Sequence, residues 1–400
     1  MEREDFIRLA GQAGQTLLAQ NDYSSEADVV ALVSRLRSQG HDPATVAAVL
    51  TQAKLRKRAK VKFGEFADQM LFTEAGLEQA SRLKVAALHA GRFRAAGIKQ
   101  VADLGCGIGA EAMAMASLGI QVSAFEIDEV TAAVATYNLA PFDNVIVEIA
   151  DVEQLDLSKF EALFFDPARR ELHGPKKASA QRHFDPANFS PNYSFCLEHA
   201  VTKPTGIKLG PGHDKRQIPT ECEAQWVSVN GDLVELGLWF GKVARENIAR
   251  SALLIDSSGQ HEITSTESDS PNAELAEIGS YVYEPDNSLI RSSLMADFAK
   301  PLGLTLISPE IAYLSSNEKI SSPWLKGYQV IDNLVFDRKK LKAYVREHNI
   351  GILEIKKRGS DISPEELRKQ LAPKGEGAAT LIVTRVGDAH RVLVTPPIGD

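Results

Sequence analysis

VADLGCGIGAEAMAMASLGIQVSAFEID, residues 101–128, is the stretch that decides the fold of this chain. A short apolar run leads into glycines at alternate positions, Gly105, Gly107 and Gly109, and a helical stretch and a second apolar run follow. Alternate glycines allow a tight turn and let a ligand approach the start of the helix with no Cβ in its way. In the dinucleotide-binding pattern GxGxxG the third glycine would stand one position later, where this chain has Ala110. The spacing favours a smaller ligand that carries a nucleoside and an amino acid but no pyrophosphate.

Short apolar runs continue to alternate with helical stretches after this motif. They read NVIVEIAD from Asn144, EALFFDP from Glu161 and TGIKLG from Thr205. Such alternation is typical of a parallel sheet covered by helices on both faces. The next stretch, AQWVSVNGDLVELGLWF, has two strand-like runs joined by Asn230-Gly231, which favours a tight hairpin because both central residues of a type I′ turn need positive φ. We expect an α/β fold with a Rossmann-like seven-stranded sheet, in which five parallel strands are followed by an antiparallel hairpin.

The flanks of this region have other patterns. The N-terminal residues have apolar positions at helical spacing, and Asp42-Pro43 starts a helix because Asp is a good cap and Pro suits the first helical position. A second hairpin is predicted in ALLIDSSGQHEIT, and residues 266–275 are polar and aperiodic, which indicates a linker. The expected organisation is an N-terminal helical region (1–97), a central domain (98–264) and a small C-terminal α+β region (276–400).

Composition narrows the classes of protein to which the chain can belong. Apolar residues make up 44% of the 400 and charged residues 24%, as in ordinary globular proteins, and no apolar run approaches the roughly 20 residues of a membrane helix. The first residues carry an acidic pair where a secretory signal would be positively charged, so we expect a cytoplasmic protein. The three cysteines and nine histidines are scattered without metal-ligand spacing, so no metal is predicted.

Basic residues are concentrated near the two ends of a chain whose net charge is −8. Residues 54–62 read KLRKRAKVK, with six basic residues in nine, and residues 337–400 hold 13 Lys and Arg against 9 Asp and Glu. Basic patches on an acidic chain suit contacts with a phosphate backbone. A solvated helix face would give the same pattern, so charge alone leaves both interpretations open.

Acidic residues stand where the second and third apolar runs end. Glu126 lies 21 positions after Gly105, where a carboxylate accepts hydrogen bonds from both ribose hydroxyls, and Asp151 is placed to accept one from an adenine amino group. Taken in order, DLGCGIG, FEID, IAD and FFDP resemble the successive cofactor-binding motifs of class I S-adenosylmethionine-dependent methyltransferases. The resemblance extends over about residues 101–240 and implies S-adenosylmethionine as the cofactor.

The resemblance also implies which residues hold the cofactor. Asp103 and the start of the helix after the glycines are expected to hold the methionine moiety. Cys106 is expected to be a small filler, because a catalytic thiolate needs a basic partner and none is adjacent in sequence. Thr73 and Gln79 of LFTEAGLEQAS are expected near the cofactor, with a surface cap as the alternative. The expected cofactor-binding set is Asp103, Gly105, Cys106, Gly107, Gly109, Glu126, Ile127, Asp151, Thr73 and Gln79.

FFDPARR ends the fourth apolar run, where methyltransferases of this class place residues that face the transferred methyl group. Enzymes that methylate the exocyclic amines of bases often have Asp or Asn, two prolines and an aromatic residue here, whereas this chain has Ala-Arg-Arg after Asp166-Pro167. The departure leaves amine specificity open. We expect Asp166 to orient or deprotonate the acceptor, with Pro167 and Arg169 completing the catalytic set. Arg170 and Lys208 are expected to bind substrate, although the two arginines could instead pair with the acidic surface.

The whole-chain pattern resembles a narrower group, bacterial class I methyltransferases with an N-terminal helical region and a C-terminal THUMP-like domain. The shared stretches are LFTEAGLEQAS, DPARR, KLGPGHD, AQWVSVNG, YEPDNSLIRSS and LEIKKRG. THUMP domains help to bind RNA, so the resemblance implies an RNA substrate, whose target base must be flipped out if it lies in a helix. It also implies a THUMP-like portion at about residues 325–400, in which Lys356, Lys357 and Arg358 are candidate phosphate contacts.

Two other classes of function stay open on the sequence alone. A small-molecule or protein methyltransferase would use the same cofactor site, and its basic ends would serve only solubility. A non-catalytic RNA-binding adaptor would keep the fold and lose methyl transfer, although the presence of Asp103, Gly105, Glu126 and Asp166 argues against it. Fold alone does not decide the substrate.

Overall fold

The computed structural model describes residues 1–20, 26–169, 189–387 and 389–396. The chain divides into two compact units, one made of Met1–Cys222 and Gly237–Glu246, the other of Glu223–Leu236 and Asn247–Asp400. One boundary between the units falls within the strand Asp232–Phe240, which belongs to the nine-stranded sheet described below. The predicted domain boundaries follow the sequence pattern instead, and they stay a prediction.

Helices make up the N-terminal part of the first unit. Asp42 caps the long helix α4 by accepting a hydrogen bond from Thr45 N at 3.0 Å, and Pro43 occupies the first turn, as the sequence predicts. Among the described residues, no helix is both long enough and apolar enough to span a membrane. The helices of this part are α1 (Arg3–Ala10), α2 (Gln12–Gln20), α3 (Glu26–Ser38), α4 (Pro43–Phe63), the short 3-10 helix η1 (Gly64–Asp68), α5 (Glu74–Gln79) and α6 (Leu83–Ala95).

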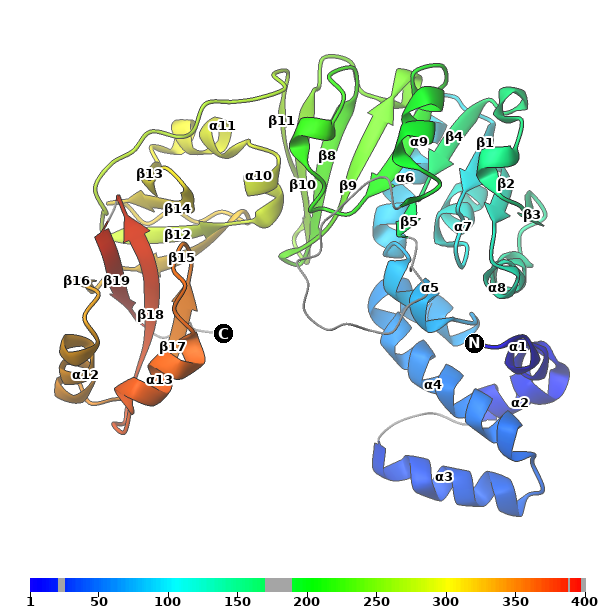
Figure 1. The fold of residues 1–400 in the computed structure, drawn as a ribbon, viewed down its shortest axis with the longest axis horizontal. Coiled ribbons are helices and arrows are strands. Elements are labelled where there is room, and N and C mark those ends of the chain that lie inside the picture. The colour runs from blue at the N-terminus through cyan, green and yellow to red at the C-terminus, as the bar shows by residue number, and fades with distance from the viewer. Residues whose placement is uncertain (21–25, 170–188, 388, 397–400) are drawn as a thin grey trace. The chain divides into compact units, whose positions relative to one another are not determined.

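The central sheet has nine strands within the described residues, in the order β11-β10-β8-β9-β7-β4-β1-β2-β3 (Figure 1). Strands β3, β2, β1, β4 and β7 run parallel to one another. Chain order reverses beside β1, with β2 on one side and β4 on the other, and such a switch point is where open α/β sheets bind ligands. The strands are β1 (Gln100–Leu104), β2 (Gln121–Glu126), β3 (Val145–Ile149), β4 (Ala162–Phe165), β7 (Thr205–Leu209), β8 (Glu223–Val229), β9 (Asp232–Phe240), β10 (Arg250–Asp256) and β11 (Gly259–Ser265).

Two hairpins follow the parallel strands. Asn230 and Gly231 have φ of 53° and 83°, as the predicted turn requires. The second predicted hairpin is also present, as β10 and β11, but it joins the same sheet because β10 pairs in parallel with β8. The prediction of seven strands was therefore two strands short. The first six residues of β10 are buried, and a strand buried in this way needs hydrogen-bonding partners at both of its edges.

Helices α7 (Ala110–Ser117), α8 (Glu129–Leu139) and α9 (Tyr193–Ala200) alternate with the parallel strands. An aromatic cluster lies in the core of the first unit. Phe93 of α6 lies 6.3 Å from Phe164 of β4 between ring centroids, and Trp239 of β9 lies 6.2 Å and 6.4 Å from these two rings. All three rings are fully buried, and each contributes roughly 1.5–3 kcal/mol of hydrophobic stabilisation. Because Phe164 precedes the end of β4 by one residue, this packing fixes the strand end that carries Asp166.

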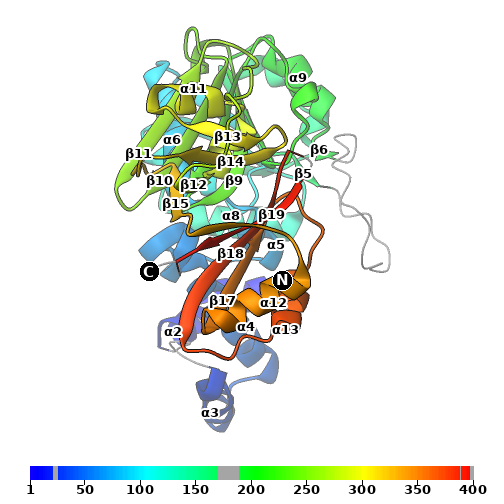
Figure 2. The same ribbon diagram turned by 90° about the vertical axis from the view of Figure 1, so that its left-hand side faces the viewer.

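The second unit contains two further four-stranded sheets within its described residues. One has the order β13-β14-β12-β15, and the other, β16-β19-β18-β17, is covered by α12 and α13 (Figure 2). Val282 and Tyr313 of the first sheet share an apolar cluster with Ile382 and Leu393 of the second. The elements are β12 (Tyr281–Pro285), α10 (Asn287–Arg291), α11 (Met295–Ala299), β13 (Thr305–Ser308), β14 (Ile311–Ser316), β15 (Leu325–Gln329), β16 (Asp332–Val335), α12 (Arg338–Glu347), β17 (Ile350–Lys357), α13 (Pro364–Leu371), β18 (Gly377–Val386) and β19 (Ala389–Thr395).

Candidate active site

The glycine turn that follows β1 is held closely against its neighbours. Gly105 and Gly107 have φ of +90° and +55°, in the region that favours glycine. A Cβ on Gly105 would lie 3.0 Å from the carbonyl oxygen of Asp166, so the ends of β1 and β4 are close together here. A Cβ on Gly107 would meet no atom of the described residues within 4 Å, so this side of the turn is open to them. Gly105 N and Cys106 N donate to the carbonyl oxygen of Phe125 at 3.0 and 2.9 Å, which fixes the turn to the end of β2.

Asp103, near the end of β1, has a fully buried side chain. Neither of its carboxyl oxygens has a hydrogen-bond partner of good geometry among the described residues, and only the nearby backbone N–H of Ala112 and the charge of Lys208 favour its ionised form. Burial, together with the charges of Glu111 and Asp166, raises the pKa of Asp103 well above its usual value. A buried carboxyl group without a partner is costly in the free protein, and a cationic ligand group would offset that cost. The position therefore fits the ammonium group of an amino-acid ligand.

Glu126 ends β2 beside the open side of the turn. Its Oε2 accepts a hydrogen bond from Gly107 N at 3.1 Å and its Oε1 accepts one from Asp128 N at 3.0 Å. Burial raises the pKa of Glu126, although these backbone donors oppose the shift. The next side chain, Ile127, is apolar and 57% exposed, which suits contact with the face of a nucleoside base. Asp151 follows β3, is exposed and caps a short 3-10 helix, so Glu126 and Asp151 lie at the carboxyl ends of two adjacent parallel strands.

Asp166 and Lys208 form an ion pair at the ends of β4 and β7. Lys208 Nζ lies 2.5 Å from Asp166 Oδ2 and also donates a hydrogen bond to the carbonyl oxygen of Gln79 at 3.2 Å. The two side chains are 26% and 11% exposed, respectively, so the pair is shielded from water but still accessible. Partial burial strengthens such a pair because the local dielectric constant is lower than that of water. The structure thus brings together two residues for which the sequence predicted separate roles.

Helix α5 packs directly on the glycine turn. A Cβ on Gly76 would lie 2.4 Å from Cγ2 of Ile108, so the close approach of helix and turn requires glycine at this position. Thr73 caps the helix by accepting a hydrogen bond from Gly76 N at 2.9 Å. Thr73 and Gln79 therefore lie at the two ends of an element that contacts the turn. Their contact with a cofactor stays a prediction.

Lys62, near the end of α4, holds the C-terminal end of α5. Burial and the nearby charges of Lys208 and Arg82 lower the pKa of Lys62 to about 8. The sequence analysis placed Lys62 in a basic run suited to nucleic acid, but the structure engages this ammonium group inside the protein. Lys62 Nζ donates hydrogen bonds at 2.7–2.8 Å to the backbone carbonyls of Leu77, Glu78 and Ala80.

Helix α8 fixes the turn from another side. A Cβ on Gly109 would lie 2.9 Å from Cδ1 of Leu139, so the turn and the helix are in direct contact. The buried amide of Asn138 donates to the carbonyl oxygens of Ile108 and Leu71, each at 3.0 Å, and accepts from Leu71 N at 2.8 Å. Asn138 therefore joins the turn to the segment that precedes α5. The sequence analysis did not identify this residue, because its partners lie 30 and 67 positions away.

A buried pair next to Asp103 was also missed. His89 Nδ1 lies 3.1 Å from both carboxyl oxygens of Glu111, and the two side chains are almost fully buried. Burial alone would raise the pKa of Glu111, but the charge and hydrogen bonds of His89 outweigh it, so the pKa is lowered. One feature of the sequence pointed to Glu111, since it is the one charged residue in the helix sequence AEAMAMAS. No motif spacing links it to a histidine 22 positions earlier.

The positions of the other predicted catalytic, substrate-binding and cofactor-binding residues are as follows. Pro167 follows Asp166, and Arg169 lies in the short strand β5 (Ala168–Arg169), whose backbone pairs with β6 (Phe189–Ser190). Arg170 lies outside the described residues. Cys106 is buried, and burial raises the pKa of its thiol well above the usual value, which disfavours a nucleophilic role. Within the described ranges no cluster of three His, Cys, Asp or Glu side chains is suited to hold a metal ion.

The predicted phosphate contacts of the C-terminal region lie on and just after β17. Lys356 Nζ lies 3.1 Å from Glu284 Oε2, and Arg358 Nη2 lies 3.4 Å from Glu284 Oε1. Arg358 also donates to the carbonyl oxygen of Ala312 at 3.0 Å. Lys357, between them, is exposed. Two of the three predicted contacts therefore have structural partners within the domain, and binding of RNA by all three stays a prediction.

Similarity to known proteins identifies the family. Over 342 residues the chain is 31% identical to an uncharacterized S-adenosylmethionine-dependent methyltransferase of Mycobacterium tuberculosis strain H37Rv, covering 83% of this chain and 91% of that protein. A protein of strain CDC 1551 matches to the same extent. The chain belongs to the S-adenosylmethionine-dependent methyltransferases. The cofactor of this methyltransferase is S-adenosylmethionine, as the sequence motifs implied.

The comparisons also confirm the fold and the C-terminal domain of the methyltransferase. A crystal structure from Porphyromonas gingivalis W83, described as a candidate methyltransferase, superposes with a TM-score of 0.69 at 21% identity, over 93% of this chain and 98% of that one. At this identity the likeness concerns the fold. Residues 325–397 match the THUMP domain-like family, and residues 2–59 match a domain of unknown function, DUF8688. The predicted class I methyltransferase with a C-terminal THUMP-like domain is confirmed.

Proposed function

We propose that this methyltransferase transfers the methyl group of S-adenosylmethionine to a base in RNA. The single observation that carries the choice of RNA is the THUMP-like domain at residues 325–397, because THUMP domains help to bind RNA. The positive charge of this part of an otherwise acidic chain agrees with a polyanionic substrate. A cytoplasmic location, expected from the N-terminal sequence, is compatible with such a substrate.

The cofactor would be held by groups whose surroundings match its parts. The buried carboxyl group of Asp103, which has no hydrogen-bond partner of good geometry among the described residues, would receive the ammonium group of the methionine moiety. Glu126 would accept the ribose hydroxyls from its position beside Gly107, and the exposed Ile127 would contact the adenine. Asp151 would accept the adenine amino group. The open side of the turn at Gly107 supports this assignment, since a ligand could approach the backbone there.

The acceptor would be held by Asp166. This residue lies where the end of β4 contacts the glycine turn, and the chain brings Lys208 to the same point. When bound, S-adenosylmethionine supplies a methyl group on a sulfonium, and the protein has to align the acceptor with it and exclude water. Asp166 would accept a hydrogen bond or a proton from the acceptor atom. Lys208 would hold the Asp166 carboxylate in one orientation through Oδ2 until the acceptor arrives.

The decisive experiment compares the three substrate classes side by side. RNA, protein and small-molecule fractions from cells that lack the gene are incubated separately with the enzyme and methyl-labelled S-adenosylmethionine. We expect label in RNA only, lost on ribonuclease treatment, and strongly reduced with Glu126→Ala enzyme at a limiting concentration of S-adenosylmethionine. Digestion to nucleosides and mass spectrometry would then identify the modified atom. Label that appears in the protein or small-molecule fraction and not in RNA would refute the proposal in favour of another methyl acceptor on the same fold.

A further inference from the structure

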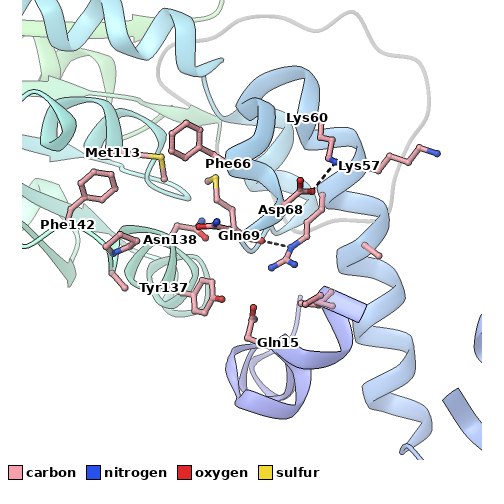
Figure 3. A pocket seen from close by; sticks show the side chains of 17 residues that line it. Gln15, Lys57, Lys60, Phe66, Asp68, Gln69, Met113, Tyr137, Asn138 and Phe142 are labelled. Carbon is pink, nitrogen blue, oxygen red and sulfur yellow. Dashed lines mark hydrogen bonds and ion pairs between the residues drawn. The ribbon is translucent and has the colours of Figure 1, made fainter. Parts of the chain in front are cut away.

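A cavity of about 1100 Å³ lies in the first unit between the N-terminal helices and the segment that contains α8 (Figure 3). Its 17 lining residues come from α2, α4, η1, α7, α8 and the segments that follow η1 and α8. None of them belongs to the predicted cofactor-binding set, and neither Asp166 nor Lys208 is among them. The cavity is large enough for a nucleotide, because pockets for small organic ligands measure about 300–1,000 Å³. It is therefore a second candidate ligand site that the methyl-transfer chemistry does not use.

Arg56 supplies a buried positive charge to this cavity. Its side chain is only 8% exposed, and its Nε donates to the carbonyl oxygen of Met70 at 2.8 Å. Its Nη2 is buried and has no hydrogen-bond partner among the described residues. The lining carboxylate of Asp68 is paired with Lys60 at 3.1 Å, as Figure 3 shows. A buried guanidinium nitrogen without an acceptor is unfavourable in the free protein, and an anionic ligand group would supply the missing acceptor.

Aromatic side chains line the same cavity. Phe66, Tyr137 and Phe142 all border it (Figure 3), and Phe66 is 60% exposed although it is a large apolar residue. Basic side chains and accessible aromatic rings around one space are the combination by which proteins bind single-stranded nucleic acid, since cations contact the backbone and bases stack on the rings. An inorganic anion alone would use the arginine but not the rings.

We propose that this cavity binds one nucleotide of a single-stranded RNA segment, with its phosphate on Arg56 and its base against Phe66 and the neighbouring rings. This inference rests on the proposed RNA substrate and adds a contact site in the N-terminal helical region. It gives the basic run at residues 54–62 a specific role, in which Arg56 contacts the phosphate inside the cavity and an exposed residue outside it, such as Lys54, contributes only long-range attraction.

Two variants and two matched controls test the site in the full-length protein. Arg56→Gln removes the buried charge, and Lys54→Gln removes one charge from an exposed position of the same helix that does not line the cavity. Phe66→Ala removes the exposed ring, and Val61→Ala truncates another exposed apolar residue, 76% exposed, outside the cavity. Phe66→Ala also guards against misfolding, because an exposed side chain contributes little to the core.

The main measurement is the affinity for a fluorescein-labelled single-stranded RNA of ten nucleotides, read as fluorescence anisotropy at several salt concentrations. We expect Arg56→Gln and Phe66→Ala each to weaken binding about 5- to 100-fold, as for loss of one stacked base or one phosphate contact. Lys54→Gln and Val61→Ala should stay within about twofold of the wild type, because neither contacts the bound nucleotide. The affinity for S-adenosylmethionine should be the same in all five proteins.

Calorimetric titration with adenosine monophosphate, adenosine and inorganic phosphate separates this inference from the proposed function. Wild-type protein should bind the monophosphate more tightly than adenosine or phosphate, and Arg56→Gln should lose the difference. The inference is overturned if Arg56→Gln and Phe66→Ala bind RNA as their controls do, even when RNA is methylated. It is equally overturned if the monophosphate binds through Arg56 while RNA does not compete, since the cavity would then take a free nucleotide. Absence of RNA methylation with Arg56-dependent RNA binding would refute the proposed function alone.

Discussion

Arg56 in the first unit and Arg250 in the second are both buried, but they differ in how many of their nitrogens have a hydrogen-bond acceptor. Their side chains are 8% and 4% exposed, and burial lowers the pKa of both guanidinium groups. Every side-chain nitrogen of Arg250 has an acceptor, whereas Nη2 of Arg56 has none within the described residues. The acceptors of Arg250 are the carbonyl oxygens of Glu267, Ser292 and Ser293 and the hydroxyl of Ser270, at 2.6–3.0 Å.

The same contrast holds for carboxyl groups. Glu284 in the second unit contacts Lys356, Arg358 and the hydroxyl of Tyr328, whereas the buried Asp103 in the first unit has no hydrogen-bond partner of good geometry among the described residues. Polar groups that are satisfied internally contribute to stability, and buried groups without partners reduce it unless a ligand binds. Buried polar groups without partners therefore indicate where ligands bind. The contrast also predicts that substitution of the unpartnered Asp103 in the first unit weakens ligand binding, whereas substitution of the well-partnered Glu284 in the second unit lowers stability.

The largest effect is expected for Asp166→Asn in the first unit. Asparagine keeps the shape and one acceptor oxygen but loses the charge and the ion pair with Lys208. If Asp166 orients or deprotonates the acceptor, kcat should fall by about two orders of magnitude or more, with little change in the affinity for S-adenosylmethionine. Steady-state kinetics and calorimetry on the same preparation measure both quantities. A fully active Asp166→Asn enzyme would show that the carboxylate only holds the loop.

Glu126→Ala should have the next largest effect, on cofactor binding. Removal of a charge-assisted pair of hydrogen bonds to the ribose costs roughly 1.5–3 kcal/mol, so the dissociation constant should rise about ten- to a hundredfold. Calorimetric titration with S-adenosylmethionine measures it. Since Glu126 also accepts hydrogen bonds from Gly107 and Asp128, circular dichroism should verify that the variant is folded. Unchanged affinity would contradict the assignment of Glu126 to the ribose.

Asp103→Asn should affect binding and stability in opposite directions. The variant should bind S-adenosylmethionine about tenfold more weakly, because one charge-assisted contact is lost. The raised pKa means that the folded protein keeps a proton that the unfolded chain releases, so its free energy of unfolding falls as pH rises between the two pKa values. Asparagine does not titrate, so the variant does not lose free energy of unfolding in this way. We therefore expect its Tm to be about 2–4 °C higher than that of the wild type at neutral pH in the absence of cofactor. Thermal unfolding between pH 4 and 8 tests this, and equal pH dependence in both proteins would refute it.

In the second unit, Glu284→Gln should lower stability and leave cofactor binding unchanged. The substitution weakens three polar contacts and leaves Lys356 and Arg358 without a charged partner at that position. We expect the Tm to fall by about 2–4 °C. Glu277→Gln, at an exposed position of the same unit, is the matched control and should change Tm by less than about 1 °C. A weaker affinity of Glu284→Gln for S-adenosylmethionine would break the functional separation between the two regions.

Local patterns in the sequence were sufficient for much of the fold. The glycine turn, the Asp42 cap and the Asn230-Gly231 hairpin depend on the conformational preferences of adjacent residues, so each could be predicted from spacing alone. The number of strands could not be predicted, because pairing of β10 with β8 joins segments whose own sequences specify only that they are strands.

The candidate site was predictable only in part for the same physical reason. Strand-end acids were found because a strand followed by Asp or Glu is a local signal. The partner of Asp166 was not found, because Lys208 lies 42 positions away and only the parallel sheet brings the two together. Arg56 was grouped with its basic neighbours, since its inward position becomes visible only when the helix is packed. Contacts between distant elements, not residue types, therefore limited the sequence analysis.

The smallest effect is expected for Lys357→Ala, which tests whether the comparison between the units extends to RNA. Glu284 forms ion pairs with Lys356 and Arg358, the two neighbours of Lys357 in the sequence. Lys357 itself is exposed on β17, so it is the best placed of the three predicted phosphate contacts to reach RNA. Loss of one such contact should weaken RNA binding about two- to fivefold and reduce the slope of log K against log salt concentration by about 0.7 for a single strand. Lys369→Ala, an exposed lysine on α13, is the control for a general loss of charge. If the two variants have the same salt slope, β17 provides only diffuse attraction, and the specific RNA contacts of this methyltransferase have to be sought in the first unit.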